Sequence, residues 1–222
     1  MHPNRVITTM TTKRLILPWL MLIGMLPAMA QNLDYRILCS LQQHRTPAMD
    51  QTMRWVSNSL VLAPAVPAAM ALGGWMAGNQ PTLHNSGQMG ASLLTTGGIT
   101  IGLKYAVGRP RPYQNYPDDL VSVTQEPDPS FPSGHTSLAF STAVSLSLQY
   151  PQWYMVAPSL MWATAVGFSR LYLGGHYPSD VLTGMLIGTL SAYATYRIQQ
   201  QRISQAQIPD PKVMLPAIKI AF

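Results

Sequence analysis

The chain consists of long apolar stretches separated by short polar ones. Residues 55–103 contain no Asp, Glu, Lys or Arg, and their main polar break is at 79–88. A second charge-free stretch covers 136–169 with a polar break at 149–153, and a further apolar stretch covers 181–196. None of them shows the regular apolar and polar alternation of a half-buried strand, so the pattern predicts helices.

The composition of these stretches favours helices inside a membrane. Several are shorter than the ~20 residues that a helix needs to cross the hydrocarbon core. They are, however, rich in Gly, Ala, Ser and Thr, which allow membrane helices to pack closely. We predict an all-α fold, an integral-membrane helical bundle with five to six transmembrane helices; a soluble helical bundle is the alternative. The first two expected spans are about 56–78 and about 90–107. The stretch 136–169 supplies two more, one before and one after the break at 149–153, and the last is 181–196.

The first 30 residues have the pattern of an export signal. Arg5, Lys13 and Arg14 precede an apolar stretch at 15–29, which ends in an Ala-Met-Ala sequence. This order of basic, apolar and small residues predicts a signal peptide cleaved after Ala30. An uncleaved first transmembrane helix is the alternative, and it would be the sixth crossing.

The next segment, 31–55, is polar and amphipathic. Its apolar residues Leu33, Ile37 and Leu38 are spaced for one face of a helix, which is typical of a helix at a membrane interface. The domain organisation that we expect is therefore 1–30 signal or first helix, 31–55 interfacial segment, 56–200 helical-bundle domain and 201–222 C-terminal tail.

Basic residues flank the two ends of the apolar region. Lys13 and Arg14 precede it, and Arg197 and Arg202 follow its last stretch. Because such flanks stay on the cytoplasmic side, an even number of crossings is expected. We predict a bacterial inner membrane protein whose site faces the periplasm. The connections expected on that outer side are 31–55, 108–135 and 170–180.

The overall composition agrees with a membrane protein. Hydrophobic residues make up 47% and charged residues 10% of the 222 residues, where a soluble domain has about 25% charged residues. The 14 basic and 8 acidic residues give a net charge of +6. The basic residues form no cluster, so we expect no nucleic-acid partner. Cys39 is the one cysteine, and a disulfide within the chain is excluded.

Three cations and two histidines lie at the outward ends of the expected spans. Lys104 and Arg111 are seven residues apart, nearly two helical turns. With Arg170, His135 and His176 they are expected on one side of the bundle. Cations gathered in this way repel one another unless an anion lies between them, and phosphate suits both guanidinium and ammonium groups.

Two further patterns supply candidate chemistry. Ser133 and Gly134 precede an apolar helix, whose first amide groups and positive dipole end attract an anion, and His135 follows for proton transfer. His176 and Asp180 are four residues apart, so the carboxylate can hold one imidazole nitrogen and leave the other as a nucleophile. We expect no metal here, because no third carboxylate or Cys accompanies the pair.

These residues together resemble the three-part signature of the type 2 phosphatidic acid phosphatase superfamily. The alternative pair Arg109-Pro110 does not fit the spacing of the first part. The resemblance covers residues 104–180 directly. The matching parts are Lys104-x6-Arg111-Pro112, Pro132-Ser133-Gly134-His135 and Ser169-Arg170-x5-His176-x3-Asp180.

The resemblance implies a role for each matched residue. His176 would form a phosphohistidine while Asp180 orients its ring, and His135 would protonate the leaving oxygen and later activate water. The phosphoryl oxygens would be held by Lys104, Arg111, Ser133, Gly134 and Arg170. Neither a metal nor a cofactor is implied.

The function expected from this resemblance is hydrolysis of a lipid phosphate monoester or pyrophosphate. Candidate substrates are phosphatidic acid, phosphatidylglycerol phosphate, undecaprenyl pyrophosphate and lipid A phosphate. The alternatives are a soluble periplasmic acid phosphatase, a vanadium-dependent haloperoxidase and a membrane protein without catalytic activity. The loop 113–130 contains four acids, for which a solvated loop is the favoured interpretation. The alternative expectation is that they limit access by multiply anionic headgroups or pair with Arg109. They are Asp118, Asp119, Glu126 and Asp128.

Overall fold

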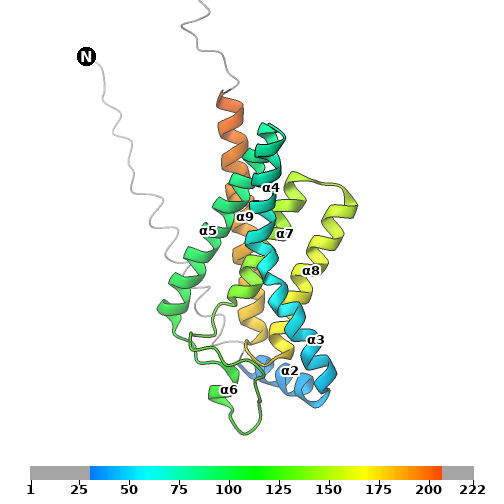
Figure 1. The fold of residues 1–222 in the computed structure, drawn as a ribbon. Helices are drawn as coiled ribbons and strands as arrows, with labels where there is room; N and C mark the ends of the chain where they lie inside the picture. The colour runs from blue at the N-terminus through cyan, green and yellow to red at the C-terminus, as the bar shows by residue number, and fades with distance from the viewer. Residues whose placement is uncertain (1–30, 207–222) are drawn as a thin grey trace, which may run out of the picture.

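The structure, a computed structural model, describes residues 31–206, and this part of the chain is helical without a β-strand (Figure 1). The predicted all-α fold is confirmed. The expected signal peptide lies outside the described residues. The elements are α2 (Gln31–Gln43), α3 (Pro47–Asn58), the 3-10 helix η1 (Ser59–Val61), α4 (Leu62–Met76), α5 (Gln80–Val107), α6 (Pro112–Asn115), α7 (Gly134–Gln149), α8 (Trp153–Tyr172) and α9 (Pro178–Ala206).

Helices α3, η1 and α4 follow one another directly. Together they form the segment Pro47–Met76, which contains an 18-residue window of mean hydropathy 1.5 and is the one candidate membrane span by length and composition within residues 31–206. The boundary expected at residue 55 falls inside α3, which begins at Pro47. The helix begins earlier because the Thr46 side chain accepts a hydrogen bond from the amide of Met49, which caps its N-terminus.

Helix α5 is longer than the span predicted at 90–107. The polar stretch 79–88 was expected to form a loop, but the Asn79 side chain accepts a hydrogen bond from the Thr82 amide and starts the helix there. The polar residues are helical because they pair across the bundle. The Gln88 amide donates to Thr195 Oγ1 of α9 at 2.8 Å.

The last helix is also longer than predicted, since α9 continues past residue 196 to Ala206. Helices α5, α8 and α9 have 28, 20 and 29 residues. At 1.5 Å per residue each of them is long enough to cross a bilayer core of about 30 Å.

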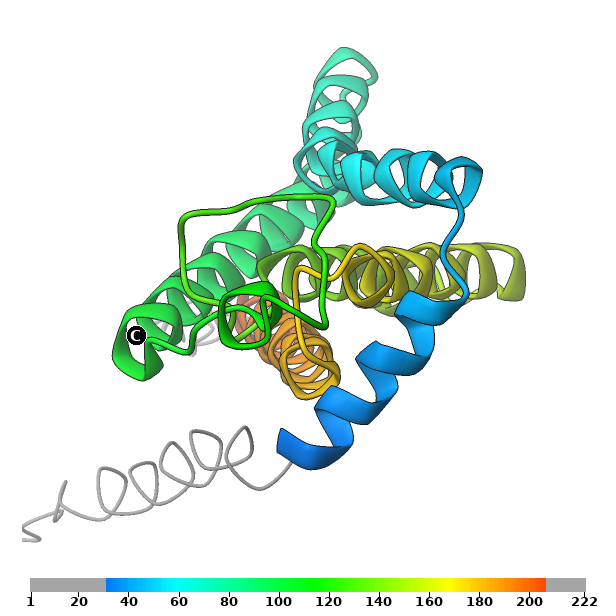
Figure 2. The same ribbon diagram turned by 90° about the horizontal axis from the view of Figure 1, so that it is seen from below.

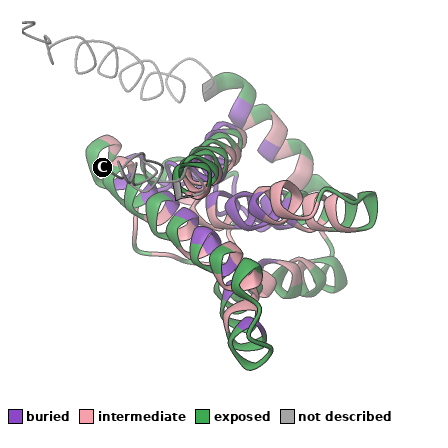
Figure 3. Cartoon of the chain, turned by 90° about the horizontal axis from the view of Figure 1, so that it is seen from above, coloured by how far each residue is buried: buried purple, intermediate pink, exposed green. Residues whose placement is uncertain are grey.

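The interior of the bundle is built from small side chains, many of them polar. Ser141 of α7 is fully buried and hydrogen-bonds Ser92 of α5 at 2.7 Å. Gly184 and Gly188 of α9 face the α7 backbone so closely that a Cβ atom at Gly188 would overlap the Ser137 carbonyl. Figure 3 shows the buried residues on the inward faces of the helices and the exposed residues outside.

The connections that carry the candidate site residues lie at one end of the bundle. Helices α2 and α6, the connection 116–133 and the connection 173–177 gather at the lower end in Figure 1 and face the viewer in Figure 2. The short turns 77–79 and 150–152 lie at the opposite end. The sequence predicts that the connections 31–55, 108–135 and 170–180 lie at one end of the bundle, and the structure has this arrangement.

The close contact between α7 and α9 leads to a first prediction. We expect Gly188→Ala to lower the free energy of unfolding by about 1–3 kcal/mol, because the added methyl group must push the two helices apart. Gly98→Ala is the control, since a Cβ atom there meets nothing within 4 Å. Thermal unfolding in detergent measures both variants, and equal stability of the two would contradict the packing described.

Candidate active site

The three predicted cations reach one place from three different elements. Lys104 lies in the last turn of α5, Arg111 directly before α6 and Arg170 in the last turn of α8. Helix α5 ends at Val107 because Gly108 adopts the left-handed conformation with a φ of 60° and terminates the helix. Arg111 and Arg170 are at most 1% exposed and Lys104 is 8% exposed.

The space between these cations holds two carboxylates from the chain itself. Glu126 contacts both Arg170 and Arg111, with 2.7 Å between its Oε2 and Arg111 Nη2. Asp128 lies 2.7 Å from Arg111 Nη2 and 2.8 Å from Lys104 Nζ. Three positive charges therefore converge on two anions, as the sequence predicts for an anion-binding site.

Both carboxylates are ionised in this environment. Burial opposes ionisation of Glu126, but the nearby Arg170 and Arg111 outweigh it and lower the pKa of Glu126 below its ordinary value. Burial also opposes ionisation of Asp128, whose hydrogen bond and charge pairing with Lys104 outweigh it and lower its pKa to about 2.

His176 lies against the same cations with one nitrogen free for chemistry. Its Nδ1 is 2.7 Å from the carbonyl oxygen of Ser130, which assigns the proton to Nδ1. The other nitrogen, Nε2, is 3.4 Å from Arg111 Nη1 and 3.9 Å from Glu126 Oε2. Burial, followed by the charges of Arg170 and the other cations, lowers the pKa of His176 well below its ordinary value. The imidazole is therefore neutral, as a nucleophile must be.

The helix start predicted around Ser133 is present. Ser133 caps α7 because its hydroxyl accepts a hydrogen bond from the Thr136 amide at 3.5 Å, and Gly134 is the first residue of the helix. A Cβ atom on Gly134 would come within 3.9 Å of the Lys104 side chain, so the helix start lies beside this cation. His135 is half-buried within electrostatic reach of Arg170 and Lys104.

The structure places Asp180 in a second charged cluster, which the sequence analysis did not identify. Asp180 Oδ2 lies 3.7 Å from His176 Nδ1, so the Ser130 carbonyl is the nearer partner of the ring. The Asp180 carboxylate instead pairs at 2.6 Å with Arg109, and Arg109 pairs at 2.9 Å with Asp34 of α2.

Arg109 and Asp34 are the functional candidates that sequence reasoning missed. Arg109 was set aside because its spacing did not fit the signature. One signal was available for Asp34, which lies four residues before Leu38 and thus on the apolar face of α2. An acid on that face needs a buried cation as partner.

The acids of the loop 113–130 do not pair with Arg109. Glu126 and Asp128 enter the cation cluster, whereas Asp119 accepts a hydrogen bond from Tyr35 outside it, and Asp118 is exposed. The expected pairing with Arg109 is wrong. Arg109 is already satisfied by buried carboxylates from α2 and α9, and Ser179 Oγ accepts a further hydrogen bond from it.

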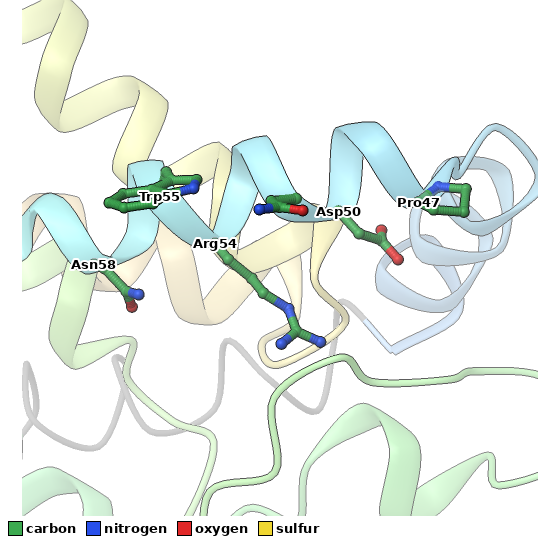
Figure 4. A pocket seen from close by; sticks show the side chains of 6 residues that line it. Pro47, Asp50, Arg54, Trp55 and Asn58 are labelled. Atoms are coloured by element: carbon green, nitrogen blue, oxygen red, sulfur yellow. The ribbon is translucent and has the colours of Figure 1, made fainter.

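Two other features lie apart from this cluster. Among residues 31–206, no group of three His, Cys, Asp or Glu side chains is arranged to hold a metal ion. A hollow of about 540 Å³ lies along α3, where Arg54 extends toward the neighbouring loop and lies 3.4 Å from the Val123 carbonyl (Figure 4). None of the predicted site residues lines this hollow.

Comparisons of the sequence agree with the resemblance. The sequence model of the PAP2 superfamily matches residues 86–204. The chain is 33% identical over 97 residues to the undecaprenyl-diphosphatase of Sulfolobus acidocaldarius, and this match covers 43% of the chain and 46% of that protein. The chain thus spans less than half the length of this relative. It is 24% identical over 169 residues to undecaprenyl-diphosphatase BcrC of Bacillus subtilis, covering 74% and 83% of the two chains.

The fold is shared with a solved membrane enzyme. A transmembrane PAP2-type phosphatidylglycerolphosphate phosphatase from Bacillus subtilis superposes with a TM-score of 0.70 at 21% identity. The superposition covers 83% of this chain and 94% of that one. The likeness supports the membrane-spanning helical bundle predicted from the apolar stretches.

The buried charge cluster leads to a second prediction. We expect Asp34→Ala to lower the free energy of unfolding by about 3 kcal/mol, because it removes one of the two buried carboxylates that pair with Arg109 and leaves the Ser179 amide without a partner. Asp50→Ala is the matched control. Its ion pair with Arg45 has the same length of 2.9 Å but is more exposed, so its loss is expected to cost about 1 kcal/mol or less. Thermal unfolding of the purified variants tests this, and similar losses would contradict it.

Proposed function

The chain belongs to the PAP2 superfamily, and on that premise we propose that it is a membrane phosphatase that hydrolyses a lipid phosphate monoester or diphosphate. One observation carries this proposal. A neutral imidazole nitrogen of His176 lies beside three buried cations that already hold anionic groups. A phosphoryl group in the place of the carboxylates would lie next to the nucleophile, with its charge compensated.

The first step forms a covalent intermediate. The lone pair of His176 Nε2 attacks phosphorus while the bond from phosphorus to the leaving oxygen breaks. His135 begins protonated and donates this proton to that oxygen, which belongs to an alcohol in a monoester and to a lipid monophosphate in a diphosphate. The guanidinium groups of Arg111 and Arg170 hold the equatorial oxygens, whose negative charge is spread in the transition state.

The second step releases phosphate. Water attacks phosphorus while His135 takes one of its protons, and the bond from phosphorus to His176 Nε2 breaks with the electron pair returning to the nitrogen. Both histidines are then in their starting states. The Nδ1–H group of His176 donates to the Ser130 carbonyl throughout, which keeps Nε2 directed at the phosphoryl group.

The surface of the bundle supports a lipid as the substrate. Large apolar side chains project outward from the spanning helices, which suits contact with lipid tails. The site lies at the end of the bundle, where a phosphate headgroup can reach it while its tail stays in the bilayer. The relatives named as diphosphatases and as a phosphatidylglycerolphosphate phosphatase suggest a polyprenyl diphosphate or a glycerophospholipid phosphate. Exposed large apolar side chains on these helices include Leu72, Trp75, Leu94, Met161 and Leu190.

The charges at the opposite end support an orientation. Arg197 and Arg202 lie in the C-terminal part of α9, away from the site. Because basic flanks are retained in the cytoplasm, we place the site on the outer, periplasmic side of a bacterial inner membrane.

The nucleophile is tested by His176→Ala. We expect phosphate release from a panel of lipid phosphates to fall by at least about 10³-fold, because the proposed covalent intermediate forms on the imidazole that this substitution removes. His84→Ala is the control, since His84 is exposed on α5 near the opposite end. A radiolabelled phosphohistidine trapped by an alkaline quench should appear in the wild type and be absent from the His176 variant. Retained turnover in that variant would refute the assignment.

The orientation is tested by thiol labelling in intact cells. In a Cys39→Ser background, Ser40→Cys places an exposed thiol at the site end, and His84→Cys places one near the opposite end. A membrane-impermeant maleimide should label the first variant in intact cells and the second only after the membrane is opened. The reverse pattern would place the site in the cytoplasm.

A further inference from the structure

The cluster around Arg109 has an unusual balance of charge. Arg109 Nη1 pairs with Asp180 Oδ1 at 2.6 Å, and Arg109 Nη2 pairs with Asp34 Oδ2 at 2.9 Å. The guanidinium also stacks on the ring of Tyr177, with its carbon 3.8 Å from the ring centre. Two carboxylates and one guanidinium leave the cluster with a net charge of −1, and all three are at most 8% exposed.

Both carboxylate oxygens of Asp34 accept hydrogen bonds from Ser179. Its Oδ1 accepts a hydrogen bond from the Ser179 amide at 3.0 Å, and its Oδ2 accepts one from the Ser179 hydroxyl at 2.5 Å. Ser179 directly precedes Asp180 at the start of α9. Helix α2 is therefore tied by one acid to the end of α5 and to the residues next to the nucleophile.

The balance of charge matters when His176 reacts. The phosphorylated imidazole carries a positive charge on the ring, and Asp180 Oδ2 is 3.7 Å from its Nδ1. An Asp180–Arg109 pair alone is neutral and offers this ring little net attraction. With Asp34 present, the cluster presents one negative charge to the ring in a buried environment, where charge interactions are strong.

We propose that Arg109 and Asp34 are positioning residues for the nucleophile, a role that rests on the proposed function. Arg109 fixes the Asp180 carboxylate, and Asp34 restores the negative charge that Arg109 cancels. The cations that hold the phosphoryl group lie on the Nε2 side of His176, so substrate binding is left largely to them.

The test compares Asp34→Asn with Asp50→Asn, which removes the same charge from a pair with Arg45 at the same distance. We expect Asp34→Asn to lower kcat about tenfold or more, to change KM by less than about threefold, and to reduce the trapped phosphohistidine. Asp50→Asn should match the wild type. Arg109→Lys, which keeps the charge but cannot bridge both carboxylates, should also lower kcat with KM retained.

The outcomes separate this inference from the proposed function. A wild-type protein without turnover on any lipid phosphate would refute the function. An active wild type with normal kcat in both Asp34→Asn and Arg109→Lys would overturn the positioning role, as would equal losses in Asp34→Asn and Asp50→Asn. A rise in KM together with a fall in kcat in Asp34→Asn would also overturn it, because this result would assign Asp34 to substrate binding.

The acids in the cation cluster carry a second, independent inference. Glu126 and Asp128 occupy the contacts of Lys104, Arg111 and Arg170 that the proposed function assigns to the phosphoryl group. The acids and a bound phosphate cannot make the same contacts at once. Their side chains are 25% and 40% exposed, so they have space to rotate away from the cations.

The backbone of this segment is held while its side chains point inward. The Tyr113 hydroxyl donates to the Glu126 carbonyl at 3.0 Å, and Arg111 Nε donates to the Asp128 carbonyl at 2.8 Å. These contacts keep the two carboxylates next to the cations. We infer that Glu126 and Asp128 are intramolecular competitors that lower the affinity of the site for phosphate and so promote its release as product.

Binding of inorganic phosphate tests this competition without requiring turnover. The dissociation constant is obtained from the rise in unfolding temperature with phosphate concentration. We expect Glu126→Gln/Asp128→Asn to lower it about tenfold, because the site is then free in a larger fraction of molecules. Asp118→Asn/Asp119→Asn changes the net charge equally on the same loop, outside the cation cluster, and should leave the constant within about twofold.

The unfolding temperature without phosphate is the second measurement. The Glu126/Asp128 double variant should unfold at a lower temperature than the wild type in phosphate-free buffer, because its cations repel one another, and it should recover when phosphate is added. Weaker phosphate binding in this variant would overturn the inference, since the acids would then be organising the cations. An equal effect in the Asp118/Asp119 variant would also overturn it.

Discussion

Repulsion among three buried cations is the constraint on which the rest of this site depends. Lys104, Arg111 and Arg170 are almost fully removed from water, and placing their charges together is costly unless an anion lies between them. The fold brings them together from the ends of three segments and supplies the anion from the loop that closes over them. A site built in this way has a standing affinity for a tetrahedral oxyanion, and the chemistry follows from what lies beside it.

The nucleophile lies between two clusters of opposite charge. On the Nε2 side of His176, three cations and two acids leave a net positive charge. On the Nδ1 side, Asp180, Arg109 and Asp34 leave a net negative charge. The neutral ring between them can accept a phosphoryl group on the positive side and share the resulting ring charge with the negative side. In the proposed mechanism the same field holds substrate and stabilises the intermediate.

The bundle that supports these clusters is polar inside and apolar outside. Helix α7 is lined by buried Ser and Thr, and glycines of α9 let the two backbones approach closely. Hydropathy therefore understates the inner helices, and Pro47–Met76 passes a simple span criterion within the described residues because it packs at the periphery. The predicted spans were too short for this reason, since polar residues such as Gln88 were assigned to a loop although they pair with α9.

Local order and residue type in the sequence determined the all-helical fold and the common end of the long connections. They also predicted that five basic side chains gather at that end, namely Lys104, Arg111, His135, Arg170 and His176. These properties follow from periodicity and from spacing within single segments. Only the tertiary structure decided which acid meets which cation. Asp34 is 75 residues from Arg109, and Glu126 is 44 residues from Arg170. Such pairs depend on how the helices pack, because a charge is satisfied by whatever partner the fold brings within reach.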